Sequence, residues 1–430
     1  MPPIIDQTRP DQTVDYELLY DKDNEQFIRH FYASHLVRKK MSFRVIDNCY
    51  LLPYGGIFDD YENYVEGSNF IDDGRRFEYK GKTLSAIAEE NNIDISNVVN
   101  EHSTVVYLGV MAGGWGHFIT DSMRFMWFQK TEDYMKNFSG CPFVYYSFQN
   151  FKPNGNYKRM LDILGINVSV MQCVETLTKY DRIILPDESF FHTSDGIRFF
   201  TPEYVETINI VRDYAIKNMK PVKSKKLYYS YSGYTSGKSV GEDKLEKYFS
   251  SKGYEIIHPE KLSFDEQLNL LVNCESFAST VGSCSHNMIF LRDDTEVILI
   301  PRANYMMGYE AALDHVHNLK ISYVDSSFSI FVGKKAPHGG PFLFFISSNL
   351  RKYFHDKDIN HIISASDFRK YLRIASGHSL GLAFGKIGEA DNPEVYRYYS
   401  KVAAEYFSQI FKSSWLHRLR KFLKKLFGRK

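Results

Sequence analysis

The sequence is poor in cysteine and lacks the patterns that mark several classes of protein. Five cysteines, at positions 49, 141, 173, 274 and 284, are spread over 430 residues without a Cys-x-x-Cys pair. This excludes a disulfide scaffold or a cysteine-rich zinc site and is typical of a reducing compartment. No apolar run approaches the ~20 residues that span a bilayer, and a secretory signal pattern is absent from the first residues. We therefore expect a soluble, cytoplasmic protein body.

The chain also has almost no net charge, but its charges are unevenly placed. Against 52 acidic residues stand 53 basic ones, a net of +1. Residues 412–430 contain eight of the basic residues and no acid, so the remainder has 45 basic and 52 acidic residues, a net of −7. Hydrophobic residues make up 43% and charged residues 24%, which is close to a globular average. The sequence thus predicts a mildly acidic globular body with a short, strongly basic end.

Strand and helix patterns alternate along two stretches of the chain. The length favours more than one domain. We expect an irregular or β-meander region at 1–103 packed on a first domain at 104–220, a second domain at 221–345 after a basic linker, and helices at 346–411. In the first domain the patterns predict strands at 104–110, 143–148, 167–171 and 182–185, and helices at 117–130, 157–164 and 202–218. In the second they predict strands at 226–231, 255–258, 276–280, 296–301 and 322–325, and helices at 241–252, 264–273 and from 287. Two such α/β units predict a ligand cleft between them, beyond the carboxyl ends of the strands.

The first candidate site follows the strand predicted at 104–110. Gly113, Gly114 and Gly116 allow a tight turn and a close approach of the backbone to a ligand. His117 and Asp121 then lie four residues apart, on one helical face, where either could serve as a general base. A helix-capping role for His117 and an ordinary ion pair of Asp121 with the following arginine remain open. The Gly-Gly-Trp-Gly string is not a dinucleotide-binding fingerprint, because the required acidic residue is missing from the next strand.

The second candidate site lies in the second unit, where a strand is again followed by a small polar turn and a helix. Its residues are suited to bind phosphate oxygens through hydroxyl, imidazole and amide groups: Gly282, Ser283, Ser285, His286 and Asn287. Ser230 and Tyr231, at the end of the strand that opens this unit, and the nearby Lys238 are placed to meet a diphosphate. A plain helix cap and a solvated loop are the structural alternatives.

Metal and nucleophile patterns are weak. The two Asp-x-Asp strings, at 21–23 and 356–358, lie in polar surroundings and read as solvated surface. His315 and His317 share one face only on a strand and have no third ligand nearby. No Gly-x-Ser-x-Gly nucleophile elbow is present, which lowers the case for a hydrolase. We therefore expect neither a metal nor a cofactor.

Three motifs together resemble glycosyltransferase family 61, which includes capsular polysaccharide biosynthesis enzymes. They are Gly-Gly-Trp-Gly-His-Phe-Ile-Thr-Asp-Ser at 113–122, Lys-Leu-Tyr-Tyr-Ser at 226–230, and Leu-Ser-Phe-Asp-Glu-Gln at 262–267 followed by 282–291 and 295–298. The resemblance covers about residues 43–345. It implies a GT-B fold, in which two Rossmann-like domains face a cleft and the second holds a nucleotide-sugar. It also implies inverting transfer without an obligatory metal, with His117 and Asp121 on the acceptor side and residues 282–287 as the donor-binding turn.

The chain departs from the family pattern at the donor side. Many relatives carry arginine where Tyr231 stands, and a Gly-Pro-His-Gly-Ala-Gly turn where this chain reads Ser-Thr-Val-Gly-Ser-Cys at 279–284. Gly282 and Asn287 keep the pattern. The departures leave the donor's identity open, and they motivate the alternative of a non-catalytic scaffold with a degenerate donor site.

The basic end has the pattern of an interfacial helix. An apolar stripe recurs every three to four residues, formed by Trp415, Leu416, Leu419, Phe422, Leu423, Leu426 and Phe427. Basic residues flank it, among them Arg418, Lys421 and Lys425. This predicts an amphipathic C-terminal helix on an anionic membrane, which we favour over a partner surface or nucleic acid.

These expectations combine into one functional hypothesis. The protein is a peripheral glycosyltransferase on the inner face of the plasma membrane. It transfers a sugar from a nucleotide-sugar to a lipid-linked or surface glycan acceptor. The alternatives are the scaffold of a glycan assembly complex and a sugar-phosphate transferase.

Overall fold

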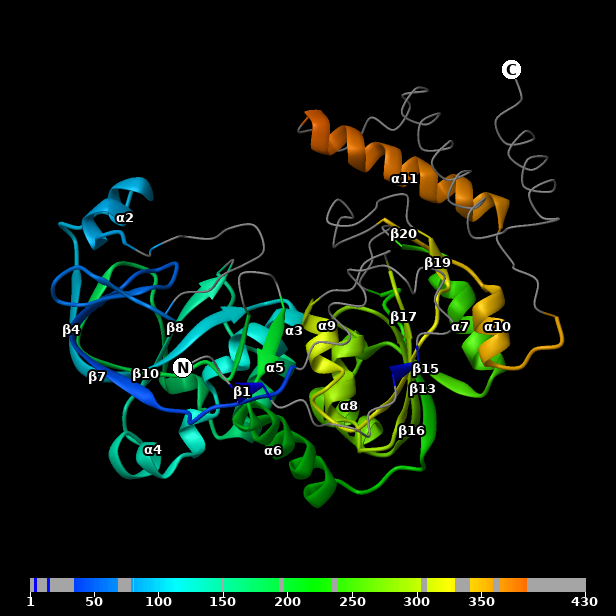
Figure 1. Cartoon of the computed structure of the whole chain (residues 1–430), viewed down its shortest axis with the longest axis horizontal. Coiled ribbons are helices and arrows are strands. Elements are labelled where there is room, and N and C mark those ends of the chain that lie inside the picture. Colours follow the sequence, from blue (N-terminus) through cyan, green and yellow to red (C-terminus); the bar gives the residue numbers. More distant parts are fainter. Residues whose placement is uncertain are drawn as a thin grey trace.

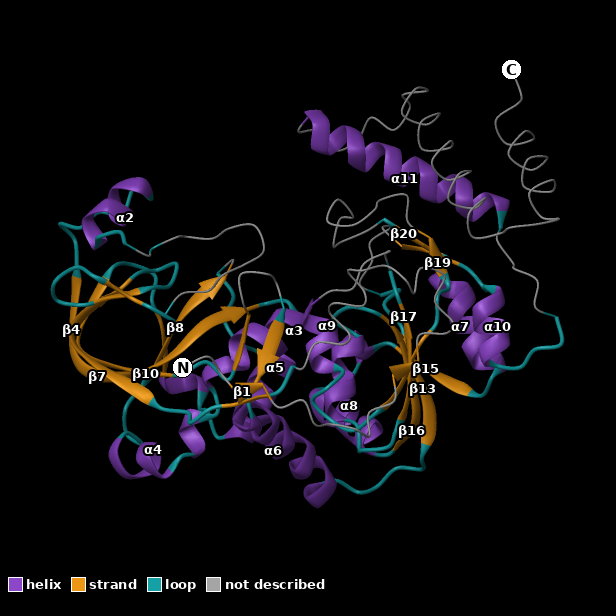
Figure 2. Ribbon diagram, in the orientation of Figure 1, coloured by secondary structure: helices purple, strands orange, loops and turns teal. Residues whose placement is uncertain are grey.

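The protein has a mixed α/β architecture in which two main sheets stand side by side with helices between them (Figures 1 and 2). The α/β class expected from the sequence is confirmed. The computed structural model describes residues 4–5, 14–15, 35–68, 79, 81–148, 150–192, 197–233, 239–302, 308–328, 341–358 and 364–384.

The first sheet has seven strands in the order β6-β5-β4-β10-β7-β8-β9. Their bounds are β4 Phe43–Leu51, β5 Ile57–Phe58, β6 Tyr64–Val65, β7 Val99–Ala112, β8 Phe143–Phe148, β9 Met171–Cys173 and β10 Thr178–Pro186. Strands β9, β8, β7 and β10 run parallel, and β4 joins β10 antiparallel before turning back through β5 and β6. Numbered along the chain, the parallel strands lie in the order 3-2-1-4, as in a nucleotide-binding half of a doubly wound sheet.

The second sheet is entirely parallel, in the order β15-β13-β16-β17-β18-β2. Its strands are β2 Val14–Asp15, β13 Lys225–Tyr229, β15 Tyr254–Ile257, β16 Cys274–Thr280, β17 Glu296–Ile300 and β18 Lys320–Tyr323. Apart from its first residue, β17 is an unbroken buried apolar run, as expected for a strand covered on both faces. From β13 to β18 the order is 2-1-3-4-5, so the chain reverses its winding between β13 and β16. In open sheets of this kind the reversal point is where ligands bind.

A layer of helices separates the two sheets and shares one hydrophobic core with both. The layer contains α5 Gly155–Leu164, α6 Pro202–Asn218, α8 Phe264–Val272, the 3-10 helix η6 Ser285–Phe290 and α9 Gly308–Leu313. The core continues from Leu108 in β7 through this layer to Phe277 in β16. On the far face of the second sheet, Tyr228 packs in a separate cluster with α7 Glu242–Ser251 and α10 Ser348–Tyr353. Side chains thus fill most of the space between the two units.

Local sequence signals fix the ends of these helices. Helix α6 starts with Pro202 in its first turn, where the missing N–H costs no hydrogen bond. Helix α8 begins with a capping box, in which Ser263 and Glu266 satisfy each other's backbone N–H groups. Both helices were expected from the sequence, and both are confirmed within one residue.

Smaller elements complete the described chain. They are α2 Leu84–Glu90, α4 Glu132–Asn137, the pair β1 Ile4–Ile5 and β3 Val37–Arg38, the hairpin β11 Phe190–His192 and β12 Arg198–Phe200, the sheet β14 Ser239–Val240, β20 Phe342–Phe344 and β19 Ser327–Phe328, and α11 Ala365–Phe384. Helix α11 contacts β14 and β20 (Figure 1). None of the helices in the described ranges is both long enough and apolar enough to cross a bilayer.

The single helix expected at 117–130 is wrong. The chain forms four short pieces instead: α3 Trp115–His117, the π-helix η1 Phe118–Ser122, and the 3-10 helices η2 Met123–Phe125 and η3 Phe128–Lys130. Nearly every side chain from Phe118 to Phe128 is buried, so the segment has no solvent face that would favour one straight helix. Packing on all sides therefore sets its backbone, and π-turns of this kind are frequent at functional sites.

Two other expectations need correction. The strand expected at 167–171 begins only at Met171, because Asn167 accepts a hydrogen bond from the backbone N–H of Ser169 and starts the 3-10 helix η4 Val168–Val170. The helix expected from residue 287 is the six-residue η6, which ends at Phe290. Its N-cap is Cys284, without a side-chain capping bond, so neither Ser283 nor Asn287 caps it.

Candidate functional site

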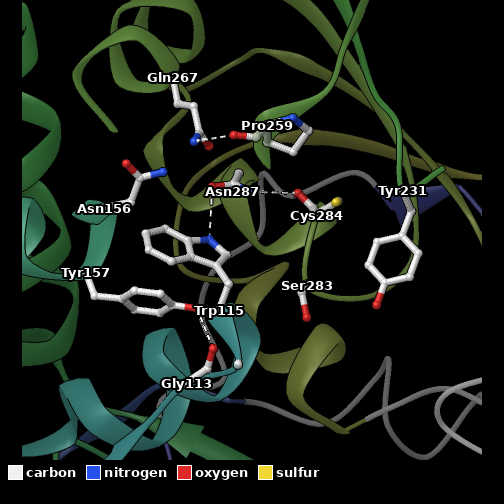
Figure 3. Close-up of a pocket in the computed structure, with 11 residues that line it drawn as sticks. Gly113, Trp115, Asn156, Tyr157, Tyr231, Pro259, Gln267, Ser283, Cys284 and Asn287 are labelled. Carbon is white, nitrogen blue, oxygen red and sulfur yellow. Dashed lines mark hydrogen bonds between the residues drawn. The ribbon is translucent and has the colours of Figure 1, made fainter. Parts of the chain in front are cut away.

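The candidate residues of both units follow strands at the reversal points of their sheets. The turn at 113–116 follows β7, the first of the parallel strands in the first sheet. The segment 230–233 follows β13 and the turn at 282–284 follows β16, the two strands that flank the reversal point of the second sheet. Residues of all three segments line one pocket of about 250 Å³ (Figure 3). The structure therefore brings together motifs that lie more than 100 residues apart in the sequence.

The pocket has an aromatic and amide lining. Its residues are Gly113, Gly114, Trp115, Asn156, Tyr157, Tyr231, Pro259, Gln267, Ser283, Cys284 and Asn287. Three aromatic rings supply stacking surfaces, three amides and several hydroxyls supply hydrogen bonds, and no charged side chain takes part. Such a lining suits a neutral ring that bears hydrogen-bonding groups, such as a sugar or a nucleobase.

Trp115 joins the two units at the centre of this lining (Figure 3). Its indole Nε1 donates to Oδ1 of Asn287 at 3.1 Å, and the amide of Asn287 donates in turn to the carbonyl of Cys284. The ring also packs edge-on against Tyr157 in α5 and Phe264 in α8. The glycine turn of the first unit is thus hydrogen-bonded directly to the polar turn of the second.

His117 and Asp121 form a hydrogen-bonded pair next to the pocket. Nδ1 of His117 lies 2.8 Å from Oδ2 of Asp121. The His117 side chain is 47% exposed, whereas that of Asp121 is only 6% exposed. A Cβ placed on the pocket-lining residue Gly114 would lie 3.5 Å from the His117 ring. The imidazole is therefore the accessible member of the pair, and the carboxylate holds it from behind.

Besides His117, three other side chains contact the carboxylate of Asp121. Thr120 donates to Oδ2 at 3.2 Å, Tyr309 donates to Oδ1 at 3.5 Å, and Nη2 of Arg124 lies 3.6 Å from Oδ1. Arg124 is itself buried and bonds Glu188 at 2.6 Å. Burial alone would lower the pKa of Arg124, but Glu188 and then Asp121 raise it above its usual value. Arg124 thus stays charged and fixes the position of Asp121 beneath His117. Both the His117–Asp121 pair and the ion pair of Asp121 with Arg124 are present.

The glycines of the first turn are required by close neighbours. A Cβ on Gly113 would lie 2.9 Å from Phe151, and the carbonyl of Gly113 accepts a hydrogen bond from Tyr157. A Cβ on Gly116 would lie 3.1 Å from both the His286 ring and the hydroxyl of Ser283. Gly116 therefore lets the turn after β7 approach the turn after β16 closely.

The turn after β16 is tied to its own backbone and to α9. Gly282 has φ +139°, a conformation that favours glycine. The hydroxyl of Ser285 accepts from the N–H of Gly282 at 2.9 Å and lies 2.6 Å from Oε1 of Glu310. Ser285 is fully buried, so it shapes the turn, whereas Ser283 and Asn287 line the pocket.

His286 forms a second histidine–carboxylate pair. Its Nε2 lies 3.1 Å from Oε2 of Glu310, which is fully buried. Its Nδ1 is buried without a hydrogen-bond partner and faces Gly116. Burial, and then the charge of Glu310, raises the pKa of the neighbouring Asp314 well above its usual value. Helix α9 thus backs both histidine pairs, through Tyr309 and Glu310.

The residues after β13 are placed differently from one another. Tyr231 lines the pocket, and the Arg302 guanidinium lies 4.0 Å from its ring centre. Ser230 is fully buried and donates to Glu246 at 2.6 Å, so it does not line the pocket. Lys238 lies outside the described residues.

Residues 115–298 match the family model described as glycosyltransferase 61. The matched segment runs from the glycine turn through the polar turn to β17, and it contains both histidines of the two pairs. This segment of the chain is similar to glycosyltransferase family 61. No curated protein matches the chain. The family's chemistry is sugar transfer, so the match supports a glycosyltransferase activity and confirms the resemblance carried by the three sequence motifs.

Several residues around this candidate site were not found from the sequence. Arg302 follows β17 by two residues, so its position after a buried strand was a usable signal. Tyr309 and Glu310 reach the site only because α9 folds against η6, and no short-range pattern reveals that contact. Asn156 and Gln267 also enter the pocket from helices. Most of these contacts depend on tertiary structure.

The metal patterns weighed in the sequence lie away from this site. Asp356 pairs with Lys252 and Arg351, and residues 21–23 lie outside the described ranges. His315 lies next to the carbonyl of Ala311, and His317 next to Arg212. Among the residues that the structure describes, no three histidine, cysteine, aspartate or glutamate side chains gather as metal ligands.

Proposed function

We propose that this protein is a membrane-attached glycosyltransferase of GT-B type that transfers a sugar from a nucleotide-sugar to a glycan acceptor with inversion. One observation carries the proposal: the turn after β7 and the turn after β16 meet at one pocket, with the His117–Asp121 pair beside it. A two-unit site with a base on one side and an anion-compatible turn on the other fits transfer from a diphosphate-linked donor. The two strand orders are consistent with two Rossmann-like units.

His117 is the general base in this proposal, and Asp121 is a positioning residue. The imidazole is half-exposed, whereas the Asp121 carboxylate is buried and already accepts two hydrogen bonds beside its contact with His117. The acceptor hydroxyl gives its proton to Nε2 of His117. Asp121 fixes the ring through Nδ1 and stabilises the imidazolium that forms. The exposure of His117 supports it as the base over Asp121, the alternative that the sequence left open.

The transfer is a single in-line displacement. The acceptor oxygen forms a bond to the anomeric carbon while the bond from that carbon to the diphosphate oxygen breaks, and the electron pair leaves with the nucleoside diphosphate. Attack from the opposite face inverts the configuration. Ser283, His286 and Asn287 stabilise the departing diphosphate, the electrostatic role of donors aimed at developing charge. Gly282 and Ser285 hold the turn that carries them.

The neutral pocket receives a ring of the donor, and the phosphates lie at its edge beside the turn. Aromatic faces of Trp115 and Tyr231 stack on a ring, and the amides of Asn156 and Gln267 select its polar edge. The charge of the diphosphate is met by protein side chains in this proposal, without an obligatory metal. Addition of EDTA should leave the transfer rate unchanged, and loss of activity that Mg²⁺ restores would contradict this part.

We further propose that residues 412–430 hold the enzyme on the inner face of the plasma membrane, beside a lipid-linked acceptor of surface or capsular glycan. The support is the sequence pattern alone, since these residues lie outside the described ranges. Each basic residue near an anionic surface contributes ~1 kcal/mol, so the cluster suffices for reversible attachment together with the apolar stripe. Deleting residues 413–430 should abolish cosedimentation with anionic liposomes and leave the melting temperature unchanged. Equal cosedimentation of both forms would refute the membrane role.

A screen of nucleotide-sugars tests the proposed reaction. Thermal shift and release of nucleoside diphosphate should identify at least one donor, and NMR of the product should show inverted anomeric configuration. The His117→Ala variant should bind that donor but release product at least 100-fold more slowly. A protein that binds no nucleotide-sugar would instead fit the scaffold alternative motivated by Tyr231 and Cys284. A product that retains phosphate would identify a sugar-phosphate transferase.

A further inference from the structure

Arg302 is a positively charged residue near the reversal point of the second sheet. It follows β17 by two residues, at the same carboxyl edge of the sheet as the ends of β13 and β16. Its Nη2 donates to the hydroxyl of Thr280 at 3.1 Å, at the end of β16. Its guanidinium also lies 4.0 Å from the ring centre of Tyr231, after β13. Arg302 thus connects both strands that flank the reversal point.

The guanidinium also lies directly against the polar turn. A Cβ placed on Gly282 would be 2.5 Å from Nη1 of Arg302 and 2.8 Å from its central carbon. Together with the φ of +139°, this contact explains why only glycine fits at position 282. The turn that lines the pocket with Ser283 therefore has a cation packed against its first residue, Gly282.

The charge of Arg302 is not matched within the described chain. No carboxylate of a described residue lies within 4.0 Å of it, and its Nε is buried without a hydrogen-bond partner. Glu242 is the acid whose titration it affects: burial raises the pKa of Glu242, and Arg302 acts in the opposite direction. Because a partly buried arginine without a paired carboxylate is costly, this position favours an anionic ligand.

A second side chain points to the same ligand. His286 is 94% buried, given its 6% exposure, and its Nδ1 has no hydrogen-bond partner. This ring and the Ser283 hydroxyl both lie 3.1 Å from the point where a Cβ of Gly116 would stand. Arg302 and His286 thus both lie close to the turn at 282–284. Both have donor atoms that the described chain leaves unused.

We infer that Arg302 is the principal diphosphate-binding residue of the donor site, with Tyr231 as the aromatic support that orients its guanidinium. The inference rests on the proposed function and adds a residue from a third strand end. An arginine binds phosphate oxygens through a planar fork of N–H groups, which stacking on a ring holds in one orientation. Arg302, which follows β17, thus places a guanidinium beside Tyr231, the position where the family resemblance leads one to expect an arginine.

The assignment separates two contributions to donor binding. The neutral pocket recognises the ring portion of the donor, and Arg302 recognises its phosphates. A nucleoside and the corresponding nucleoside diphosphate differ only in the part that Arg302 meets. A merely structural role of Arg302 would weaken both ligands alike, because the pocket as a whole would be disturbed.

The test is calorimetry on the full chain with inorganic pyrophosphate, and with nucleoside and nucleoside diphosphate pairs of each base. The variants are Arg302→Gln, Arg302→Lys and the matched control Arg182→Gln, which removes an exposed ion pair on β10. Arg302→Gln should weaken pyrophosphate and nucleoside diphosphate binding by about 10- to 100-fold and leave nucleoside binding within about twofold. Arg302→Lys should lie between the wild type and Arg302→Gln, and the control should match the wild type.

The outcomes are distinct. If the wild type binds a nucleotide-sugar and Arg302→Gln binds the diphosphate equally well, Arg302 does not bind phosphate, and the proposed function stands. Equal weakening of nucleoside and diphosphate would assign Arg302 a structural role and would also overturn the inference. If the wild type binds neither pyrophosphate nor any nucleotide, both the inference and the proposed function fail. Should Arg302→Gln not fold, Arg302→Lys decides, since undiminished pyrophosphate affinity there contradicts recognition by a planar fork.

Discussion

Replacing Asp121 with asparagine removes one negative charge from the centre of the proposed acceptor side while keeping the shape of the side chain. The carboxylate is 2.8 Å from Nδ1 of His117 and 3.6 Å from Nη2 of Arg124. An amide in its place still fits beneath the imidazole. It no longer stabilises an imidazolium, and its NH₂ group has no acceptor on Arg124.

The two consequences have different magnitudes. Hydrogen bonds to charged groups contribute about 1.5 to 3 kcal/mol and neutral ones about 1 kcal/mol. Because Glu188 still pairs with Arg124, Asp121→Asn should lower the free energy of unfolding by about 1 to 2 kcal/mol. The loss of an oriented base should lower turnover by about 10² to 10⁴, which corresponds to about 3 to 5 kcal/mol in the barrier. Donor affinity should not change, since Asp121 does not line the pocket.

Urea unfolding, turnover and donor titration on the same preparation measure these three quantities. The matched control is Asp181→Asn, which makes the same change in the His102–Asp181 pair, whose side chains are 84% and 56% exposed. The control should keep full turnover and nearly full stability. An Asp121→Asn enzyme with wild-type turnover would refute the role of the His117–Asp121 pair. A loss of turnover that parallels a loss of folded protein would reduce that role to stability alone.

Three further predictions concern the turns and the pocket. Gly282→Ala should lower the free energy of unfolding by more than Gly253→Ala does. Both glycines have positive φ, so each variant has about 1 to 3 kcal/mol of backbone strain, but only a Cβ at position 282 would also meet Arg302. Equal losses in urea unfolding would contradict that contact. Burial raises the pKa of Cys284 to about 12, against a smaller opposing effect of Arg302. The Cys284 thiol should therefore resist iodoacetamide at pH 8.5 until the protein is denatured. Rapid labelling of the native protein, detected by mass spectrometry, would show that the turn carrying Cys284 opens. Trp115→Phe keeps an aromatic ring, though a smaller one, and loses the 3.1 Å hydrogen bond to Asn287, so donor affinity should fall about three- to tenfold in calorimetry. An unchanged affinity would show that this hydrogen bond does not shape the pocket.

Much of the fold could be predicted because the strands of the second sheet have clear local patterns in the sequence. Strands β13, β16 and β17 are short apolar runs bounded by polar turns, and helix α8 carries its capping box in the sequence. The candidate turn after β16 closely follows such a strand, which is why Gly282 and Ser283 could be singled out. Here a local pattern and the final structure agree.

The remainder depended on contacts that no local pattern encodes. The segment from Phe118 to Phe128 is buried on all sides, so helical periodicity could not predict its π and 3-10 turns. Trp115 and Asn287 are 172 residues apart, and Glu310 reaches His286 only through the packing of α9. Ser230 lies at a strand end as expected, but its hydroxyl points to Glu246. Position along the chain thus predicts where a side chain starts, and packing decides where it points.

The central claim is that the two units form one site for sugar transfer, with His117 as its base. The most direct measurement is product release from the nucleotide-sugar that binds best, compared between the wild type and His117→Ala with donor affinity measured in parallel. The account predicts that both proteins bind the donor equally and that only the wild type releases nucleoside diphosphate with acceptor-dependent formation of an inverted glycoside. Transfer at the wild-type rate by His117→Ala, or the absence of any nucleotide-sugar that binds the wild type, would contradict it.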